Sequence, residues 1–300
     1  MNNKPKKSRA STAPDPQFKV KEETELMSFL LAQMPHKNRD NIKTFLKYKQ
    51  VLVNGQPVSQ FNYRLMSGQT VTITRNKIAP AKTYKGIGIL YEDNDLIVID
   101  KHAGVLSVAT GSNEKFTAYS LLYDHVKKNS PDGKIFIVHR LDRDTSGVMI
   151  FAKSAKVQKA FQQSWNEIIR ERVYVALAEG VVDPGAGEIS SYLKENANRV
   201  VYSSQEPGDG QWAVTQYETI RSNPNYSLLR MSLRTGRKNQ IRVHLMDIGH
   251  PIVGDKKYGS KQNPLGRMGL HALVIAFRHP VTGQEMRFET RIPRKFHLAI

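Results

Sequence analysis

Hydrophobic residues recur along this chain with different periods, and the changes of period divide it into four segments. Residues 1–17 show no period and are rich in Lys, Pro, Ser, Thr and Ala, which predicts a disordered basic tail. Residues 18–76 combine two helical patterns with short β runs and form a compact unit. Residues 77–86 lack a period and indicate a linker, and residues 87–300 form a larger unit. The tail is either a solvated leader or an arm that tethers RNA.

The second helical pattern of the smaller unit has an apolar face and a basic face. Ile42, Phe45 and Leu46 recur on the apolar face. The basic face carries three cations at a spacing of four residues: Arg39, Lys43 and Lys47. A β run over residues 51–53 then ends in an Asn-Gly turn. This helix pair followed by a VLVNG strand resembles the ribosomal S4-like RNA-binding domain, an α/β module, and implies that the basic face contacts RNA.

The larger unit alternates short apolar strands with few helices. Residues 96–99, 135–138 and 148–151 are uninterrupted apolar runs, as a buried sheet requires. Further strands are predicted over residues 173–178, 200–203, 212–219 and 226–234. One helix is predicted from the N-cap Ser154 to Ile168, and another over residues 240–248. Because strands and helices do not alternate regularly, we expect an α+β fold with a mixed, largely antiparallel sheet.

The composition favours a polyanionic partner. Across 300 residues, Lys and Arg outnumber Asp and Glu by 45 to 27, a formal charge of +18. Such an excess creates a positive surface potential that attracts nucleic acid. No apolar run reaches the roughly 18 residues of a membrane span, the first residues lack a signal peptide, and there are no cysteines. We therefore expect a monomer in the cytoplasm that binds RNA and no membrane.

The densest polar cluster is the stretch HRLDRDTSG at residues 139–147, between two apolar strands. Its carboxylates, cations and hydroxyls must pair with one another or with a ligand, so a salt-bridged loop remains an alternative to a catalytic loop. A kinase loop would have the order His-Arg-Asp, and a serine hydrolase would have Gly-x-Ser-x-Gly. The histidines are scattered singly, which favours structural or RNA-contacting roles and predicts no metal site.

This stretch resembles the "H-R-L-D-x-x-T-S-G" signature of the RluA-type pseudouridine synthases. Four further stretches resemble motifs of that family in the expected order. They are ILYEDNDLIVIDK at residues 89–101, RVYVAL at residues 172–177, LRTGRKNQIRVHL at residues 233–245 and GHPIVGD at residues 249–255. The resemblance implies the pseudouridine synthase fold over about residues 87–296 and isomerisation of uridine in folded RNA without any cofactor. Asn239 departs from the family pattern, which has a frequent His at that position.

The resemblance also implies the catalytic residues. Asp142 corresponds to the essential carboxylate, acting as a nucleophile or a base. An always-charged arginine is expected beside it, and Arg242 of the QIR segment takes that place, with Arg237 as the alternative. Tyr174 corresponds to the active-site tyrosine, whose ring can stack on the flipped uracil and whose hydroxyl can assist proton removal at C5.

Further residues are expected to contact RNA. Arg140 would fill the space that the extruded nucleotide leaves. The others in the larger unit are His139, Arg237, Lys238, Gln240 and Lys257. Residues 231–261 hold seven Lys or Arg against two Asp, so we interpret this stretch as the main phosphate-binding edge. The expected substrate is large-subunit ribosomal RNA, with transfer RNA as the second choice. A non-catalytic ribosome-assembly factor or a DNA-binding regulator would also explain the charge, but neither would need Asp142.

Overall fold

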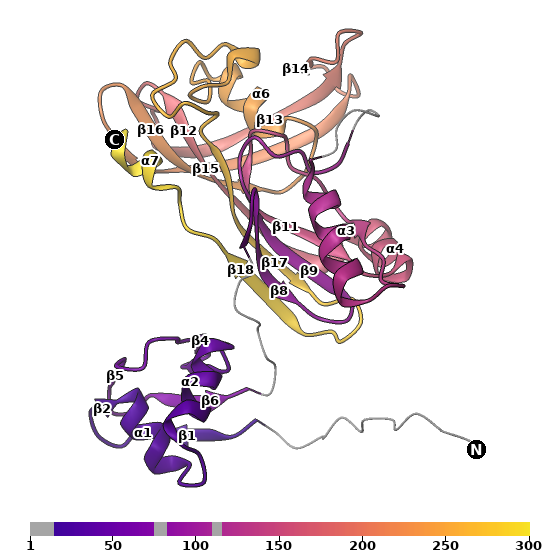
Figure 1. Cartoon of the computed structure of the whole chain (residues 1–300). Helices are drawn as coiled ribbons and strands as arrows, with labels where there is room; N and C mark the ends of the chain where they lie inside the picture. Colours follow the sequence, from indigo (N-terminus) through magenta and orange to yellow (C-terminus); the bar gives the residue numbers. More distant parts are fainter. Residues whose placement is uncertain (1–14, 75–82, 110–115) are drawn as a thin grey trace, which may run out of the picture. The chain divides into compact units, whose positions relative to one another are not determined.

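The computed structural model describes residues 15–74, 83–109 and 116–300, and the chain divides into two compact units, Met1–Pro80 and Ala81–Ile300 (Figure 1). Residues 1–14 of the predicted tail and residues 77–82 of the predicted linker lie outside the described residues. Both boundaries differ from the prediction. Gln17 already pairs with Thr72 in a sheet, and Thr83–Tyr84 form a strand of the larger unit. Isolated two- and three-residue strands carry no period of their own, so the sequence pattern missed them.

The smaller unit packs two helices against short strands around one core. Its elements are β1 (Gln17–Lys19), β2 (Thr24–Glu25), α1 (Leu26–Gln33), α2 (Arg39–Lys47), β3 (Val51–Val53), β4 (Gln56–Pro57), β5 (Arg64–Leu65) and β6 (Thr70–Ile73). The strands form a sheet in the order β1-β6-β3-β4 and a separate pair β2-β5. Leu30, Ile42 and Val51 are fully buried in the core that these elements share.

Local chemistry explains the limits of α2 and of the following hairpin. Asn38 caps the helix, because its side chain accepts a hydrogen bond from the backbone N–H of Asn41 at 2.9 Å. The predicted Asn-Gly turn joins β3 to β4, with positive φ angles of 49° at Asn54 and 79° at Gly55. The three cations at a spacing of four residues are all exposed on α2, as the pattern predicts.

The larger unit is built on one 12-stranded sheet. Its strands are β7 (Thr83–Tyr84), β8 (Ile87–Glu92), β9 (Leu96–Lys101), β10 (Phe136–Ile137), β11 (Ser146–Ala152), β12 (Ile169–Glu179), β13 (Ala186–Glu195), β14 (Val201–Ser204), β15 (Gln211–Ser222), β16 (Tyr226–Leu233), β17 (Leu270–Arg278) and β18 (Glu285–Glu289). The main order is β14-β13-β15-β16-β12-β17-β11-β9-β8-β7. Among the described strands only β11 and β17 pair in parallel, so the predicted mixed, largely antiparallel sheet is confirmed.

Helices cover both faces of the sheet. They are α3 (Ala118–Asn129), α4 (Ala155–Gln163), α5 (Trp165–Ile168), α6 (Gln240–Asp247) and α7 (Arg294–Leu298), with a 3-10 turn at Lys256–Tyr258. Leu122 of α3 packs with Ile97 and Ile99 of β9, whereas Phe161 of α4 packs with the alternate residues Leu96 and Val98. Burial from both sides explains why the first four residues of β9 are all apolar. Figure 1 shows α6 beside the strands β13 and β15.

Several elements of the larger unit differ from the sequence prediction. The helix expected from Ser154 to Ile168 is broken, because α4 ends at the C-cap Ser164 and a separate turn, α5, begins at Trp165. Helix α3 and strand β13 were not predicted. The polar face of α3 and the small residues of β13 weaken the hydrophobic period of each, and tertiary packing decides both. No helix in the described part of the chain is long and apolar enough to cross a membrane.

Candidate active site

The loop that precedes β11 carries the polar cluster, and its middle is fixed to the core. Leu141 is 5% exposed and packs among the residues beneath α3. The hydroxyl of Ser107 donates to the Leu141 carbonyl oxygen at 2.6 Å and accepts from the Leu141 N–H at 3.0 Å. At the start of the loop, His139 Nε2 accepts a hydrogen bond from the N–H of Ile150 at 3.0 Å. The loop therefore presents the residue after Leu141 in a defined position.

A buried lysine holds the second half of the same loop. Lys101 is fully buried at the end of β9, where its Nζ donates to three carbonyl oxygens, those of Val105 at 2.7 Å, Arg143 at 3.0 Å and His102 at 3.2 Å. Burial lowers the pKa of Lys101 to about 8, although the nearby Asp144 opposes this shift. Neither Lys101 nor Ser107 has a role that the sequence pattern predicts. The available signal was a lysine at the end of a strand that begins with four apolar residues.

A glycine lets β11 begin against β17. Gly147 has a φ angle of 115°, and a Cβ on it would lie 2.1 Å from the carbonyl oxygen of Ala272. Any side chain there would separate the two strands. Ala272 also pairs with Tyr174 on β12, so this point of the sheet brings the loop and the tyrosine strand together.

Asp142 forms an ion pair with Arg242, as expected. Arg242 Nη1 lies 3.0 Å from Asp142 Oδ2, and the two side chains are 13% and 33% exposed. On its other edge Arg242 donates Nε and Nη2 to the two carboxylate oxygens of Asp255, at 2.6 and 2.8 Å. Burial opposes the charge on Arg242, but the hydrogen bonds and charge of Asp255, and then of Asp142, raise the pKa of Arg242. The bidentate pair fixes the guanidinium that faces Asp142.

Two more residues orient Arg242. Asn239 adopts a left-handed conformation with a φ angle of 57° and accepts a hydrogen bond from Arg242 Nη1 at 3.0 Å. Its amide nitrogen donates to the hydroxyl of Tyr258 at 2.9 Å, and the Tyr258 ring lies 4.7 Å from the guanidinium carbon. Asn239, which replaces the family's usual His, thus links the arginine to its aromatic neighbour. Tyr258 has no role that the sequence pattern predicts, and Asp255 was expected only as one of two acids within the basic stretch.

A cleft of about 340 Å³ opens above the Asp142–Arg242 pair. Tyr174 lines this cleft together with the apolar side chains of Leu141, Ile241 and Leu270. Burial raises the pKa of the Tyr174 hydroxyl, Arg172 opposes the shift and Asp142 adds to it, so the phenol is neutral at pH 7. A charged carboxylate, a fixed guanidinium and an aromatic ring with apolar walls can hold a flat polar ring beside a nucleophile or base.

The residues predicted to contact RNA differ in their exposure to solvent. Arg140, Arg237, Lys238 and Lys257 are exposed, and the first three line the cleft. Gln240 is only 2% exposed, and its amide bonds to Thr235, Thr215 and backbone groups inside the protein. Gln240 also lines the cleft, so a contact of Gln240 with RNA stays a prediction although its amide is bonded within the protein.

Three expectations change in the same region. Arg237 does not pair with Asp142; its Nε donates to the carbonyl oxygen of Trp212. Burial, with a smaller contribution from Arg172, lowers the pKa of His139 to about 4, so this imidazole is neutral and holds the loop. Arg242 belongs to the carboxylate pairs and not to a phosphate-binding edge, and Lys238 forms an ion pair with Glu195.

Other histidines serve the fold. Burial lowers the pKa of His244 and of His271 to about 4. His244 bonds to Ser191 and Thr215, and His271 bonds to Ser146 and Thr290. Neither is available to RNA.

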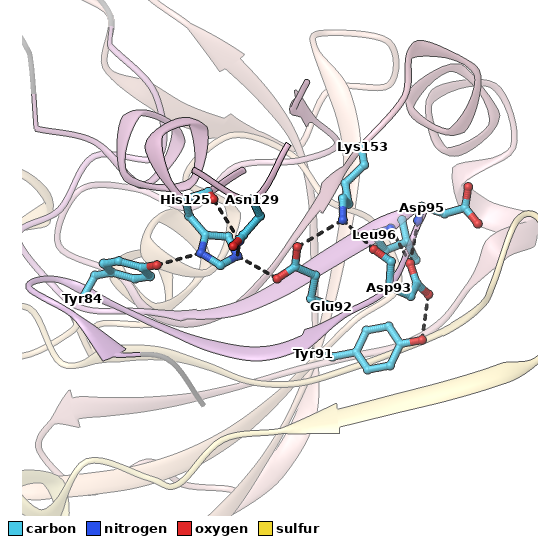
Figure 2. A network of polar contacts seen from close by, with 9 residues as sticks. All are labelled: Tyr84, Tyr91, Glu92, Asp93, Asp95, Leu96, His125, Asn129 and Lys153. Carbon is cyan, nitrogen blue, oxygen red and sulfur yellow. Dashed lines mark hydrogen bonds and ion pairs between the residues drawn. The ribbon is translucent and has the colours of Figure 1, made fainter. Parts of the chain in front are cut away.

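The acidic residues after β8 form the group most like a metal site. Oxygen or nitrogen atoms of Asp93, Asp95 and His279 lie within 4.8 Å of one another. However, His279 Nδ1 accepts from the N–H groups of Val281 and Thr282, so Nε2 carries the proton and donates to Asp93 Oδ2 at 3.1 Å. Figure 2 shows Asp93 also accepting from the Tyr91 hydroxyl and from backbone N–H groups of the following turn. These bonds engage both carboxylate oxygens of Asp93 and both ring nitrogens of His279.

The network in Figure 2 continues through Lys153, the residue after β11, and connects β7 and β8 to α3. The buried His125 of α3 bonds to the Tyr84 hydroxyl and to Glu92 Oε2, each at 2.7 Å, and Glu92 Oε1 pairs with Lys153. Burial alone would raise the pKa of Glu92, but the bonds from His125 and Lys153 lower it. The network anchors α3, which covers the Leu141 side of the loop.

Comparisons with known proteins agree with this geometry. A sequence profile of the RNA pseudouridylate synthase family matches residues 95–247. An uncharacterized RNA pseudouridine synthase of Bacillus subtilis is 33% identical over 257 residues, covering 84% of each chain. The ribosomal large subunit pseudouridine synthase D of Neisseria meningitidis serogroup B is 30% identical over 290 residues, covering 91% of this chain and 77% of that one.

A solved structure, the human RNA pseudouridylate synthase domain containing 4, shares the fold with a TM-score of 0.58 at 24% identity, over 70% of this chain and 90% of that one. The sequence relatives extend over both units of the chain, and the profile spans the loop of Asp142, the strand of Tyr174 and the helix of Arg242. This chain therefore belongs to the RNA pseudouridylate synthase family.

Proposed function

We propose that this chain isomerises uridine to pseudouridine in large-subunit ribosomal RNA, with Asp142 as the reacting carboxylate. The observation that carries the proposal is the 3.0 Å ion pair between Asp142 and Arg242 in a cleft that Tyr174 also lines. Relatives named for the ribosomal large subunit support the choice of RNA, and the formal charge of +18 supports a polyanionic partner. We expect the protein to act as a cytoplasmic monomer.

The chemistry requires little besides a positioned carboxylate. The bond between uracil N1 and ribose C1′ breaks, a bond between C5 and C1′ forms, C5 loses a proton and N1 gains one. Atoms and electrons balance within the nucleotide, so the reaction consumes no co-substrate. Asp142 supplies the nucleophile or base, and Arg242 stabilises its negative charge. Asp255, Asn239 and Tyr258 act as positioning residues, because each touches Arg242.

Tyr174 is assigned to binding of the base. Its ring forms part of the cleft wall, and a raised pKa makes a phenolate scarce at neutral pH. A neutral phenol stacks on uracil and donates a hydrogen bond, but it is a weak base. This favours stacking over proton removal from C5. Arg140, exposed at the cleft, is assigned to the RNA strand around the extruded nucleotide.

The experiment that tests the function is tritium release from unmodified RNA. Large-subunit ribosomal RNA and transfer RNA, each transcribed with uridine labelled at C5, are incubated with the full chain in EDTA without added cofactor. We expect release from the ribosomal RNA, and pseudouridine at the corresponding positions. Release from transfer RNA alone would move the substrate to that class. Tight binding without any release would indicate a non-catalytic RNA-binding factor.

The smaller unit is proposed to bind RNA through α2. Replacing Arg39, Lys43 and Lys47 with Gln should lower the slope of log affinity against log salt by about two to three units, since each lost phosphate contact contributes roughly 0.7–0.9. Filter binding of the labelled ribosomal RNA between low and moderate salt measures the slope. The matched control replaces three exposed cations of the same unit outside α2: Lys19, Lys21 and Arg64. Equal slopes for both triple variants would contradict a contact at α2.

A further inference from the structure

A second cavity of about 420 Å³ lies beside the catalytic cleft. Five residues line both cavities: Arg140, Tyr174, Leu233, Gly236 and Arg237. The catalytic cleft continues from there to Asp142 and Arg242, whereas the second cavity continues to Trp165 and Arg172. The shared wall makes the two cavities neighbours, with Tyr174 between them. Neither Asp142 nor Arg242 lines the second cavity.

The second cavity is lined by three guanidinium groups and by no carboxylate. They belong to Arg140, Arg172 and Arg237, and among the described residues none of the three forms an ion pair with an acidic side chain. Arg172 is half-buried, and its contact is with the Trp165 ring, 5.9 Å from the guanidinium carbon. Burial lowers the pKa of Arg172, Tyr174 opposes the shift and Arg237 adds to it. Because Arg172 is partly buried and has no acidic partner among the described residues, its positive charge favours binding of an anion.

The backbone at Gly236 lies close to the guanidinium group of Arg172. A Cβ on Gly236 would lie 2.2 Å from Arg172 Nη1. The loop between β16 and α6 therefore passes directly over the guanidinium. Arg172 precedes Tyr174 by two residues on β12, so both side chains lie on the same face of the sheet. Strand and loop together direct this cation into the cavity.

The rest of the cavity suits a flat aromatic group. Its floor is apolar and buried, formed by Val148, Ala272, Val274 and Ile275. Trp165 forms one side, with the neutral His139 ring 5.4 Å from it. Cations at the rim, an aromatic side and an apolar floor are the features with which proteins hold unpaired nucleotides, where phosphate contacts position the chain and stacking binds the base.

We propose that the second cavity is a subsite for a nucleotide adjacent to the target uridine, whose base packs beside Trp165 and whose phosphate binds Arg172, Arg140 and Arg237. The inference rests on the proposed function, because it takes the neighbouring cleft as the site of the uridine. Its volume lies within the range of pockets that enclose small ligands. The subsite makes the enzyme bind an unpaired segment of at least two nucleotides.

Intrinsic fluorescence tests this directly, since the chain has only two tryptophans, at positions 165 and 212. Full-length Trp212→Phe leaves Trp165 as the sole indole. The probe is a single-stranded octamer of uridylate, and an abasic octamer with the same phosphates is the comparison. We expect the uridylate octamer to quench Trp165 emission and the abasic octamer to bind without quenching. Equal emission with both RNAs, or no quenching by the octamer, would overturn the subsite.

Affinity measurements provide the second arm. Arg172→Gln should weaken octamer binding, measured by anisotropy of a labelled octamer, and lower its salt slope by roughly 0.7. Trp165→Ala should weaken binding about 5- to 150-fold, the usual effect of removing one stacking partner. The matched control is Arg170→Gln, because Arg170 is exposed on the same strand, pairs with Glu285 and does not line the cavity. Equal losses for Arg170→Gln and Arg172→Gln would refute the assignment.

The two proposals fail in distinguishable ways. Tritium release without quenching of Trp165 would leave the enzymatic function intact and remove the subsite. Quenching of Trp165 without tritium release from any RNA would leave an RNA-binding cavity and remove the function. Circular dichroism of each variant shows whether a loss reflects unfolding, and Trp212→Phe keeps both cavities unchanged.

Discussion

Asp142→Asn is expected to reduce tritium release from labelled ribosomal RNA by at least about 100-fold, while RNA affinity stays within a few-fold of the unmodified protein. The change removes the charge of the reacting carboxylate but almost no volume. Arg242 keeps its position, because Asp255 holds it through two hydrogen bonds at 2.6 and 2.8 Å. Single-turnover rates and filter binding measure the two quantities separately.

The neighbouring Asp144 supplies the control for this prediction. Asp144 belongs to the same loop and is exposed, but it does not line the catalytic cleft. Asp144→Asn should therefore retain most of the activity. If Asp142→Asn remained within tenfold of the original rate, or if both variants lost activity equally, Asp142 could not be the reacting group.

How much of the site could be predicted depended on the distance along the chain between interacting residues. The stretch at residues 139–147 was recognisable as a loop because apolar runs flank it, and α6 followed from its helical period. Asp142 and Arg242 are separated by 100 residues along the chain, and only the family resemblance predicted that they pair. Physical chemistry alone required some cation near Asp142 without choosing between Arg242 and Arg237.

The residues that support the site were not predictable from local pattern. Asp255 was counted as an acid that weakens a basic edge, whereas in the fold it neutralises Arg242 at 2.6 Å. Lys101 had no predicted role, although its ammonium group donates to three carbonyl oxygens. Gln240 was expected to contact RNA, but it is buried at the start of α6. In each case tertiary contacts, which leave no period in the sequence, decide the role.

The pair formed by Arg242 and Asp255 leads to the second large effect. Arg242→Ala leaves Asp255, which is 3% exposed, as a buried carboxylate without its partner. Breaking such a pair costs about 3–5 kcal/mol of unfolding free energy, which corresponds to a fall in Tm of roughly 6–20 °C for a unit of this size. We expect Arg242→Ala to lose both stability and catalysis, whereas Arg237→Ala and Lys257→Ala should mainly weaken RNA binding. Calorimetry and single-turnover tritium release measure the first two losses.

Arg242→Ala with Asp255→Asn separates those losses. The double variant has no buried charge without a partner, so more than half of the lost Tm should return; a residual cost remains because the Asn amide lacks the two bonds that Arg242 donated. Activity should not return, because nothing then holds a guanidinium 3.0 Å from Asp142. Recovery of both would show that Arg242 serves the fold alone. A double variant as unstable as Arg242→Ala would show that the charge of Asp255 is not the source of the instability. Stability restored while catalysis stays lost is the result that assigns Arg242 to the reacting carboxylate.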